Sequence, residues 1–343
     1  FSDFGSIGAE QGDKIKIQSP VDLGEADEFD ANTGFANTDI KTGTIDITVD
    51  QHFGKQFAIT DIDFTKAKTE GYFPSTAESA VKACSTVLSK YIYSGYKEVP
   101  NLSGSVSTAD FDKATMLRAE KKMFDNLAPE TDVMFAALNS NRYAELLTDL
   151  TAVDVNGSDQ ALRNATTGMV ASFQVYRDTL LAKLKHTNGT AKDSAMTLDS
   201  AITKGDKVLV LAGATAAETV LKGDIINITL DDGETEQLVA DADATAGAST
   251  VSISLSHPVK GEAAIGNAAV YANTEVSYDV NLGFQKNFYA LVMRPLTGAN
   301  VESNEDGSTI VSQVDPRSGM SIRLESWRDS QLKKNLWSFD ILF

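Results

Sequence analysis

Residues 75–92 read STAESAVKACSTVLSKYI, and the rest of the chain is organised around this stretch. Ser75 follows Pro74, and Glu78 comes three residues later, which is the pattern of a capping box at the start of a helix. Apolar side chains then recur at helical spacing, at positions 77, 80, 81, 84, 88, 91 and 92. The pattern predicts a helix of about five turns that begins at Ser75 and has one apolar face.

Upstream of this helix, two short segments alternate polar and apolar residues. They are residues 13–17 (DKIKI) and 44–49 (TIDITV), and period-two alternation predicts half-buried strands. Residues 19–43 lie between them and are too long for a tight turn. We expect a two-stranded arm that carries an extended tip.

Downstream, helical and extended patterns follow one another. Residues 110–127 predict a helix with Phe111, Ala114, Leu117, Phe124 and Leu127 on one side, ended by the proline at position 129. Residues 132–138 predict a buried strand, and residues 141–150 a short helix. This mixture indicates an α+β fold.

Residues 203–275 have a different character. Short apolar runs begin near positions 207, 224, 235 and 250, and turn formers such as Lys222-Gly223-Asp224 separate them. Such spacing predicts a small all-β barrel or sandwich. We expect four parts: residues 1–70 as an arm remnant and extended loop, 71–194 as the main helix and a second domain, 195–275 as an inserted barrel-like domain, and 276–343 as return strands that complete the first two.

The chain of 343 residues is acidic, with a formal net charge of −18. Residues 1–70 hold 14 Asp and Glu against 6 Lys, and residues 203–275 hold 11 acidic against 4 basic residues. An acidic protein gains no affinity for DNA from counterion release, so specific nucleic-acid binding is not expected. No apolar run approaches the roughly 18–20 residues of a membrane helix.

Enzyme signatures are missing from the sequence. It contains neither a phosphate-binding Gly-x-x-x-x-Gly-Lys motif nor a Gly-x-Ser-x-Gly elbow, and its three histidines are far apart. Cys84 is the only cysteine, which excludes an internal disulfide, and its place on the helix face predicts a buried, unreactive thiol. We therefore assign no catalytic, cofactor or metal residue.

Two aromatic residues, Phe29 and Phe35, stand in the polar segment between the arm strands. Packing within the tip is one interpretation, and docking on another subunit is the other, because aromatic side chains anchor interfaces. The carboxylates around Phe29 favour a basic partner surface. The candidate subunit-contact residues are Asp22, Glu25, Asp27, Glu28, Phe29, Asp30 and Phe35.

Several short motifs, in a shared order, resemble the major capsid proteins of tailed double-stranded-DNA bacteriophages. Residues 12–20 (GDKIKIQSP) resemble the start of that family's extended loop, 44–63 its returning strand, and 75–96 its spine helix. Residues 170–177 (VASFQVYR) resemble a family turn in which Ser172 replaces the usual glycine. The later matches are residues 222–226 (KGDII), 281–291 (NLGFQKNFYAL), 315–323 (DPRSGMSIR) and 339–342 (FDIL).

The resemblance implies the Hong Kong 97-type capsid fold, with peripheral and axial domains and an inserted β-domain. It also implies assembly into hexamers and pentamers of an icosahedral shell in the virion, formed in the host cytoplasm and enclosing DNA. Implied partners are further copies of the chain, a scaffolding protein, a portal and, in some relatives, a decoration protein.

Three other classes remain to be weighed. A phage tail-tube protein would form tubes. A β-rich adhesin would carry a secretion signal and more strand than helix, and an enzyme with an inserted β-domain would carry a convergent polar site.

Overall fold

The computed structural model describes residues 12–18, 44–64, 72–104, 111–126, 133–151, 169–285, 289, 291–293, 309–314 and 320–343. The chain divides into two compact units, one made of residues 1–88 and 290–343 and the other of residues 89–289. Both units combine helices with sheets, so the chain has the α+β architecture that the sequence predicts.

The first unit is built on an antiparallel sheet in the order β18-β19-β20-β3. The strands are β18 (Thr309–Val314), β19 (Ser321–Asp329), β20 (Lys334–Leu342) and β3 (His52–Thr60). All nine residues of β20 pair with β3, from Lys334 opposite Thr60 to Leu342 opposite His52. The aromatic, alternating C-terminus is therefore a central strand of this sheet.

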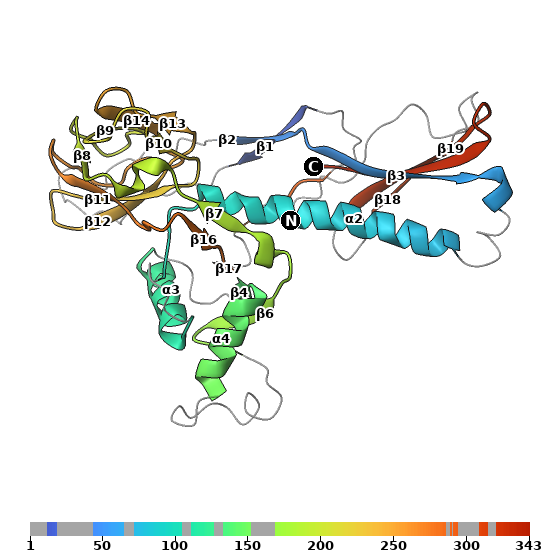
Figure 1. Ribbon diagram of the computed structural model, residues 1–343, viewed down its shortest axis with the longest axis horizontal. Coiled ribbons are helices and arrows are strands. Elements are labelled where there is room, and N and C mark those ends of the chain that lie inside the picture. Colours follow the sequence, from blue (N-terminus) through green and yellow to red (C-terminus); the bar gives the residue numbers. More distant parts are fainter. Residues whose placement is uncertain are drawn as a thin grey trace, which may run out of the picture. The chain divides into compact units, whose positions relative to one another are not determined.

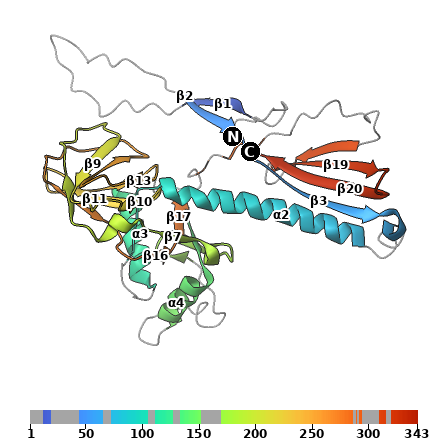
Figure 2. The same cartoon turned by 45° about the horizontal axis from the view of Figure 1, so that its top comes forward.

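Aromatic side chains line up across β3 and β20. Phe57 stacks on Trp337 with ring centroids 5.5 Å apart, and Phe53 stacks on Phe343 at 5.9 Å. The helix α2 (Tyr72–Ser94) lies beside this sheet in Figures 1 and 2. Its Cys84 is 3% exposed and donates from Sγ to the carbonyl of Phe339 at 3.6 Å, which confirms the predicted buried thiol.

The start of α2 differs from the prediction. The helix begins at Tyr72 and not at Ser75, so Pro74 lies inside its first turn. Proline is tolerated there because the first-turn N–H groups have no partner within the helix. Glu78 forms a 2.9 Å ion pair with Lys82 one turn later. The buried stripe of the helix is Ala80, Cys84 and Leu88.

The predicted arm strands are present as β1 (Asp13–Gln18) and β2 (Thr44–Val49). They pair antiparallel over six positions, from Asp13 opposite Val49 to Gln18 opposite Thr44. Ile15 and Val49 are buried in one cluster with Leu342, so packing against the last residues of β20 fixes the base of the arm.

The second unit contains a mixed sheet in the order β17-β4-β6-β5. Its strands are β17 (Leu282–Gln285), β4 (Met134–Leu138), β6 (Phe173–Arg177) and β5 (Met169–Val170). β4 and β6 run parallel, and α4 (Ser140–Thr151) lies between them in the chain. These elements confirm the strand and the short helix predicted for residues 132–150.

The helix predicted from position 110 is α3 (Lys113–Asp125). Asp112 caps its start, because the carboxylate accepts from the backbone N–H of Thr115 at 2.8 Å. Its predicted apolar side is wrong. The side that packs on the core carries Met116, Ala119 and Met123, whereas Leu117 is 46% and Phe124 is 54% exposed.

Residues 196–271 form a six-stranded sheet in the order β12-β11-β15-β8-β9-β14 (Figure 2). An isolated bridge between Ala240 and Leu255 joins its two edges, which closes it into a barrel around one apolar core. The strands predicted near positions 207, 224, 235 and 250 are all present. The strands are β8 (Met196–Leu198), β9 (Val208–Ala212), β11 (Ile225–Thr229), β12 (Thr235–Val239), β14 (Thr250–Ser254) and β15 (Ala268–Tyr271).

Short elements connect the barrel to the rest of the second unit. β7 (Lys185–Thr187) pairs antiparallel with β16 (Ser277–Asp279), so the chain enters and leaves the barrel region side by side. The remaining pieces are the 3-10 helices η1 (Gly95–Glu98), η2 (Leu181–Lys183) and η3 (Thr190–Asp193) and the short pair β10 (Thr219–Val220) and β13 (Ala244–Thr245).

Candidate functional site

The seven subunit-contact residues predicted from sequence lie between positions 22 and 35, outside the residues that the structure describes. The structure places the two strands that bear this segment but not its side chains. The docking of Phe29 and Phe35 on another subunit therefore stays a prediction. Within the described residues, the second unit holds two concentrations of polar contacts beside the barrel.

The first of these is a buried junction centred on Asp224, which is 0% exposed. Its Oδ2 accepts from the backbone N–H groups of Gly189 at 3.0 Å and Leu221 at 2.8 Å, and from the hydroxyl of Tyr271 at 3.0 Å. Its Oδ1 lies 2.9 Å from Nε2 of His186, which is 2% exposed. Leu221 belongs to the same turn as Asp224, and the other partners are distant from it in sequence. One carboxylate therefore joins β7, β11 and β15.

Tyr96 extends this junction to η1. A carboxylate oxygen can only accept, so Nε2 of His186 is the donor to Asp224. That tautomer leaves Nδ1 to accept from the hydroxyl of Tyr96 at 3.0 Å. Tyr278 packs against the other side of the imidazole, with ring centroids 5.3 Å apart. The histidine is thus held on three sides, as a structural residue rather than a solvent-accessible base.

Two glycines let the chain approach this junction closely. Gly223 has a φ of +96°, and a Cβ there would lie 3.1 Å from the imidazole Cε1 of His186. At Gly189 a Cβ would lie 2.1 Å from the carbonyl oxygen of Thr219, a contact that no side chain can occupy. The sequence Lys222-Gly223-Asp224 therefore forms the turn into β11 and also places the carboxylate of Asp224 next to His186.

Burial, and next to it the charge of Asp224, raises the pKa of Tyr96 from 10.0 to about 12. The pKa values of Tyr271 and Tyr278 are also raised, first by burial. Above pH 10 the unfolded chain loses phenolic protons that the folded chain still holds, so the free energy of unfolding falls as pH rises.

We expect these phenols to leave the stability of the second unit unchanged up to about pH 10 and to lower it from there toward pH 12. Denaturant unfolding at a series of alkaline pH values measures this. Tyr96→Phe should make the free energy of unfolding depend less steeply on pH, by the equivalent of up to about one proton. The same slope in the Tyr96→Phe variant and in the parent would contradict the role of this phenol.

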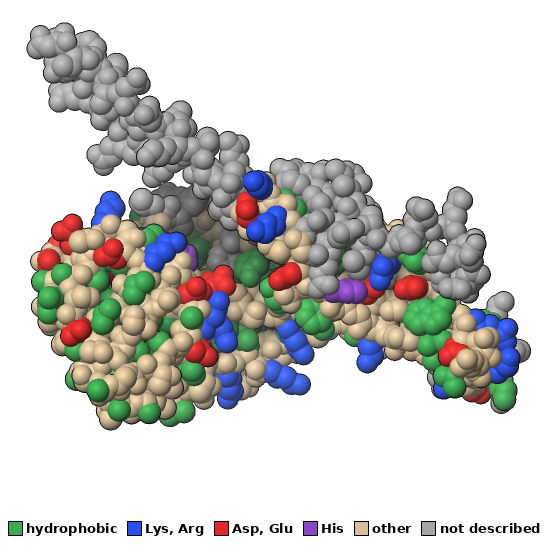
Figure 3. Space-filling view, turned by 90° about the horizontal axis from the view of Figure 1, so that it is seen from above, with side chains coloured by type: hydrophobic (Ala, Val, Ile, Leu, Met, Phe, Trp, Pro, Cys, Tyr) green, Lys and Arg blue, Asp and Glu red, His purple; other side chains and the backbone are tan. Residues whose placement is uncertain are grey.

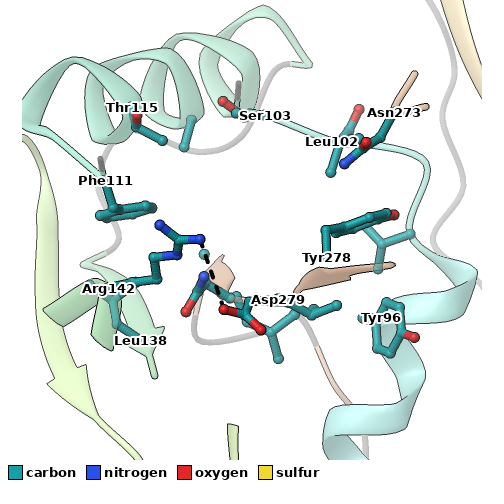
Figure 4. Close-up of a pocket in the computed structure, with 18 of the residues that line it drawn as sticks. Tyr96, Leu102, Ser103, Phe111, Thr115, Leu138, Arg142, Asn273, Tyr278 and Asp279 are labelled. Carbon is teal, nitrogen blue, oxygen red and sulfur yellow. Dashed lines mark ion pairs between the residues drawn. The ribbon is translucent and has the colours of Figure 1, made fainter. Parts of the chain in front are cut away.

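A cavity of about 460 Å³ lies between η1, α3, β4 and the β16–β17 segment (Figure 4). Phe111, Leu138 and Tyr278 give it apolar walls, and Arg142 points into it toward Asp279, with Nη2 3.9 Å from the carboxylate. Arg142 also pairs with Glu145 at 2.8 Å. Because acidic partners already balance the cation, the cavity presents no unpaired charge to a ligand from this group.

The described residues offer little to a catalytic mechanism. They include no group of three or more His, Cys, Asp or Glu side chains that could hold a metal ion. Burial raises the pKa of the Cys84 thiol, which disfavours the thiolate that a nucleophile requires. In the same part of the chain, no helix is both long and apolar enough to cross a membrane.

Sequence reasoning missed the junction. The sequence shows only that its three histidines are far apart, whereas the structure shows that His186 is a core histidine paired with an acid 38 positions away. The one signal available in sequence was the Lys-Gly-Asp turn at the start of a strand, which predicts the turn but not its partner.

On the face seen in Figure 3, acidic side chains are scattered over the barrel and basic ones form no continuous surface.

Comparison with known proteins gives structural similarity alone. No family model matches the chain, and no curated protein matches it. Solved structures from bacteriophages do match. A structure from Mycobacterium phage Che8 covers 78% of this chain and 83% of its own, at 16% identity and a TM-score of 0.39.

Two further matches are described as capsids. The capsid structure of the cyanophage P-SCSP1u has 13% identity and a TM-score of 0.39, and covers 78% of this chain and 86% of its own. The mature capsid of bacteriophage PhiM1 has 11% identity and a TM-score of 0.37, covering 78% and 82%.

Proposed function

We propose that this chain is the major capsid protein of a tailed double-stranded-DNA bacteriophage, a shell-building protein and not an enzyme. The observation that carries the proposal is the order of its parts. An arm hairpin, a long helix beside a sheet, a mixed α/β region, a barrel and a final sheet strand follow one another as the sequence resemblance predicts.

The finer part of the proposal is the Hong Kong 97-type fold with the barrel as an inserted domain. In it, α2 is the spine helix, and the strands β18, β19, β20 and β3 complete the peripheral domain. The β17-β4-β6-β5 sheet with α3 and α4 forms the axial domain. Copies of the chain assemble into hexamers and pentamers of an icosahedral shell, with a scaffolding protein and a portal as partners.

Negative-stain microscopy of the purified protein tests the proposal. We expect closed shells, formed alone or with a co-expressed scaffolding protein, and capsomer rings at low concentration. Tubes would identify a tail-tube protein instead. Discrete particles under both conditions would favour an enzyme or an adhesin and overturn the capsid assignment.

The proposal includes DNA, which the shell encloses without specific binding. Each phosphate neutralised by a lysine or arginine adds affinity through counterion release, and the net charge of −18 opposes that gain. Unassembled protein should not retard random duplex DNA in a gel at physiological salt. Submicromolar binding, or a reproducible sequence preference, would contradict this part of the proposal.

The barrel is expected to fold when residues 195–275 are expressed alone. Its core is one cluster that includes Leu209, Leu211, Ile228 and Ile253, each fully buried, and its ends meet where β7 pairs with β16. Amide NMR spectra of the fragment should be well dispersed. A collapsed spectrum would show that the barrel needs the rest of the second unit.

The arm tip is expected to contact a neighbouring subunit. Replacing Phe29 and Phe35 with Ser should leave the monomer folded, because neither residue belongs to a predicted core, but reduce shell formation. Particle yield by sedimentation and circular dichroism of the monomer measure the two effects. Val270→Ser, at a 51% exposed position of the barrel, serves as the control. An unchanged yield of normal particles from the double variant would refute the contact.

A further inference from the structure

The outer face of α3 has the chemistry of a docking surface. Leu117 and Phe124 are 46% and 54% exposed, and they lie seven residues apart on one side of the helix. The exposed cations around them are Lys113, Arg118 and Lys121. We call these five residues the α3 outer face. The helix packs on its own core through the opposite side, and that core leaves the outer face exposed.

The cations of the α3 outer face form no ion pair with another described residue. The ion pairs within the described part of the chain all join other side chains. Asp125 is the single exposed acid on the helix. The face therefore presents three positive charges and one negative charge around two apolar side chains, and a surface that is both acidic and apolar complements it.

One end of the barrel has that complementary chemistry. The turn between β11 and β12 and the segment before β15 meet there, because the backbone N–H of Asp231 donates to the carbonyl of Glu262 at 3.0 Å. The carboxylate of Asp231 also accepts from the backbone N–H of Ala264 at 2.9 Å. We call the exposed residues at this end the barrel tip, and they are Asp231, Asp232, Glu234, Glu262 and Ile265.

The barrel tip surrounds one large apolar side chain with negative charge. Ile265 is 66% exposed. The two segments of the tip, residues 229–235 and 261–267, contain four Asp and Glu and no Lys or Arg. None of these acids forms an ion pair with a residue that the structure describes. Two tips repel each other, so the partner of a tip has to be a basic surface.

Contacts between α3 and the barrel fix the spacing of the two surfaces. Lys122, on the inner side of α3, donates to the side chain of Gln237 on β12. Lys260 donates to the side-chain oxygen of Asn126, just after α3, at 3.4 Å. The face and the tip therefore have the same spacing in every copy. Two different surfaces that fit each other make a head-to-tail contact, which repeats from copy to copy and closes into a ring if its rotation allows.

We propose that the α3 outer face binds the barrel tip of a second copy of the chain. Leu117, Phe124 and Ile265 form the apolar centre of the contact, and cations and carboxylates face each other around it. The apolar centre supplies affinity, and the charges set orientation and partner choice. The inference rests on the proposed capsid function, because a head-to-tail contact builds a ring of subunits.

Charge reversal in two variants tests the pairing. The face variant carries Lys113→Glu and Lys121→Glu, and the tip variant carries Glu234→Lys and Glu262→Lys. Each variant alone should lose shell yield by about tenfold or more, because like charges then meet across the contact. A single chain with all four changes should recover the yield, because each of its cationic tips then meets an acidic face.

A matched control carries Lys183→Glu and Lys207→Glu, which change the net charge as the face variant does, at two other exposed positions of the same unit. It should keep the parent yield. Circular dichroism and denaturant unfolding show that each variant compared is folded. Normal shells from either single variant would overturn the inference, and so would a folded four-change chain that does not recover the yield.

Cross-linking tests whether the contact joins two copies, and it does not depend on shells. One preparation of the full chain carries Leu117→Cys, and a second preparation, with a tag that changes its size, carries Ile265→Cys. Cys84 is 3% exposed, so a short bismaleimide reagent reacts with the introduced thiols. The control pair replaces Ile265→Cys with Val276→Cys, at a 65% exposed position where the chain leaves the barrel.

The mixed, unassembled preparations should yield a dimer of one tagged and one untagged chain. Its amount should exceed that of the control pair by about tenfold, because a specific contact raises the effective concentration of the two thiols. A mixed dimer at the level of the control pair would overturn the inference, whether or not the parent protein forms shells. A selective dimer that the two face changes abolish would uphold the contact even if the parent protein formed no shells.

Discussion

Replacing Asp224 with Ala is expected to lower the free energy of unfolding of the second unit by about 3–5 kcal/mol. The carboxylate is fully buried and takes hydrogen bonds from two backbone N–H groups and one hydroxyl, in addition to its contact with His186. Without it, all four donors stay buried and lose their acceptor, and each unmade hydrogen bond costs about 1–3 kcal/mol. The total loss stays below the sum of these costs, because the protein relaxes around the site and water enters it.

Denaturant unfolding of the unassembled protein, followed by far-ultraviolet circular dichroism, measures this loss. Asp232→Ala is the matched control, because Asp232 is an exposed acid in the same barrel that accepts from the backbone N–H of Glu234 at 2.9 Å. The control should change stability by less than about 1 kcal/mol. If the two variants were equally stable, the junction would not hold the barrel to η1 and β7.

The comparison of sequence and structure explains why this junction could not be foreseen. Strands with period-two alternation, such as β1 and β2, are local patterns, and the sequence predicts them at nearly their observed positions. The contact of His186 with Tyr96 spans 90 residues of sequence, and that with Asp224 spans 38. Only the folded chain brings such residues together.

The two helix errors have local physical causes. At α2, Pro74 was treated as the residue before the helix, whereas the first turn accepts proline because its N–H groups need no partner. At α3, Leu117 and Phe124 were assigned to the core by their hydrophobicity. Met116 and Met123, which have the same spacing, occupy the core instead. A helix with two apolar stripes does not reveal from its sequence which stripe is covered.

Replacing Asp340 with Asn is expected to destabilise the first unit by about 3 kcal/mol, in the range found when one partner of a buried ion pair is removed. The Asp340 side chain is 7% exposed and the Arg323 side chain 16%. Arg323 binds both carboxylate oxygens, with Nε 2.9 Å from Oδ1 and Nη2 2.5 Å from Oδ2, which raises the pKa of its guanidinium. His52 adds a third contact at 3.1 Å, so the carboxylate ties three neighbouring strands together.

Gly54 completes the arrangement, because it faces Asp340 across the β20–β3 pair. A Cβ at Gly54 would lie 3.0 Å from both the Cβ of Asp340 and the carbonyl oxygen of Phe339. The absence of a side chain at Gly54 therefore lets β3 lie close to Asp340. An amide at position 340 would leave the guanidinium half-paired where little water reaches it. The geometry that makes the pair strong also makes its loss costly.

An exposed pair in the same sheet provides the control. Arg328 contacts Asp61 at 2.6 Å, but their side chains are 58% and 34% exposed, so Asp61→Asn should cost at most about 1 kcal/mol. A double-mutant cycle of Asp340→Asn with Arg323→Gln isolates the coupling of the buried pair. We expect a coupling energy above about 1 kcal/mol for the buried pair and a smaller one for the exposed pair. Equal couplings would show that burial does not set the strength of the Arg323–Asp340 contact.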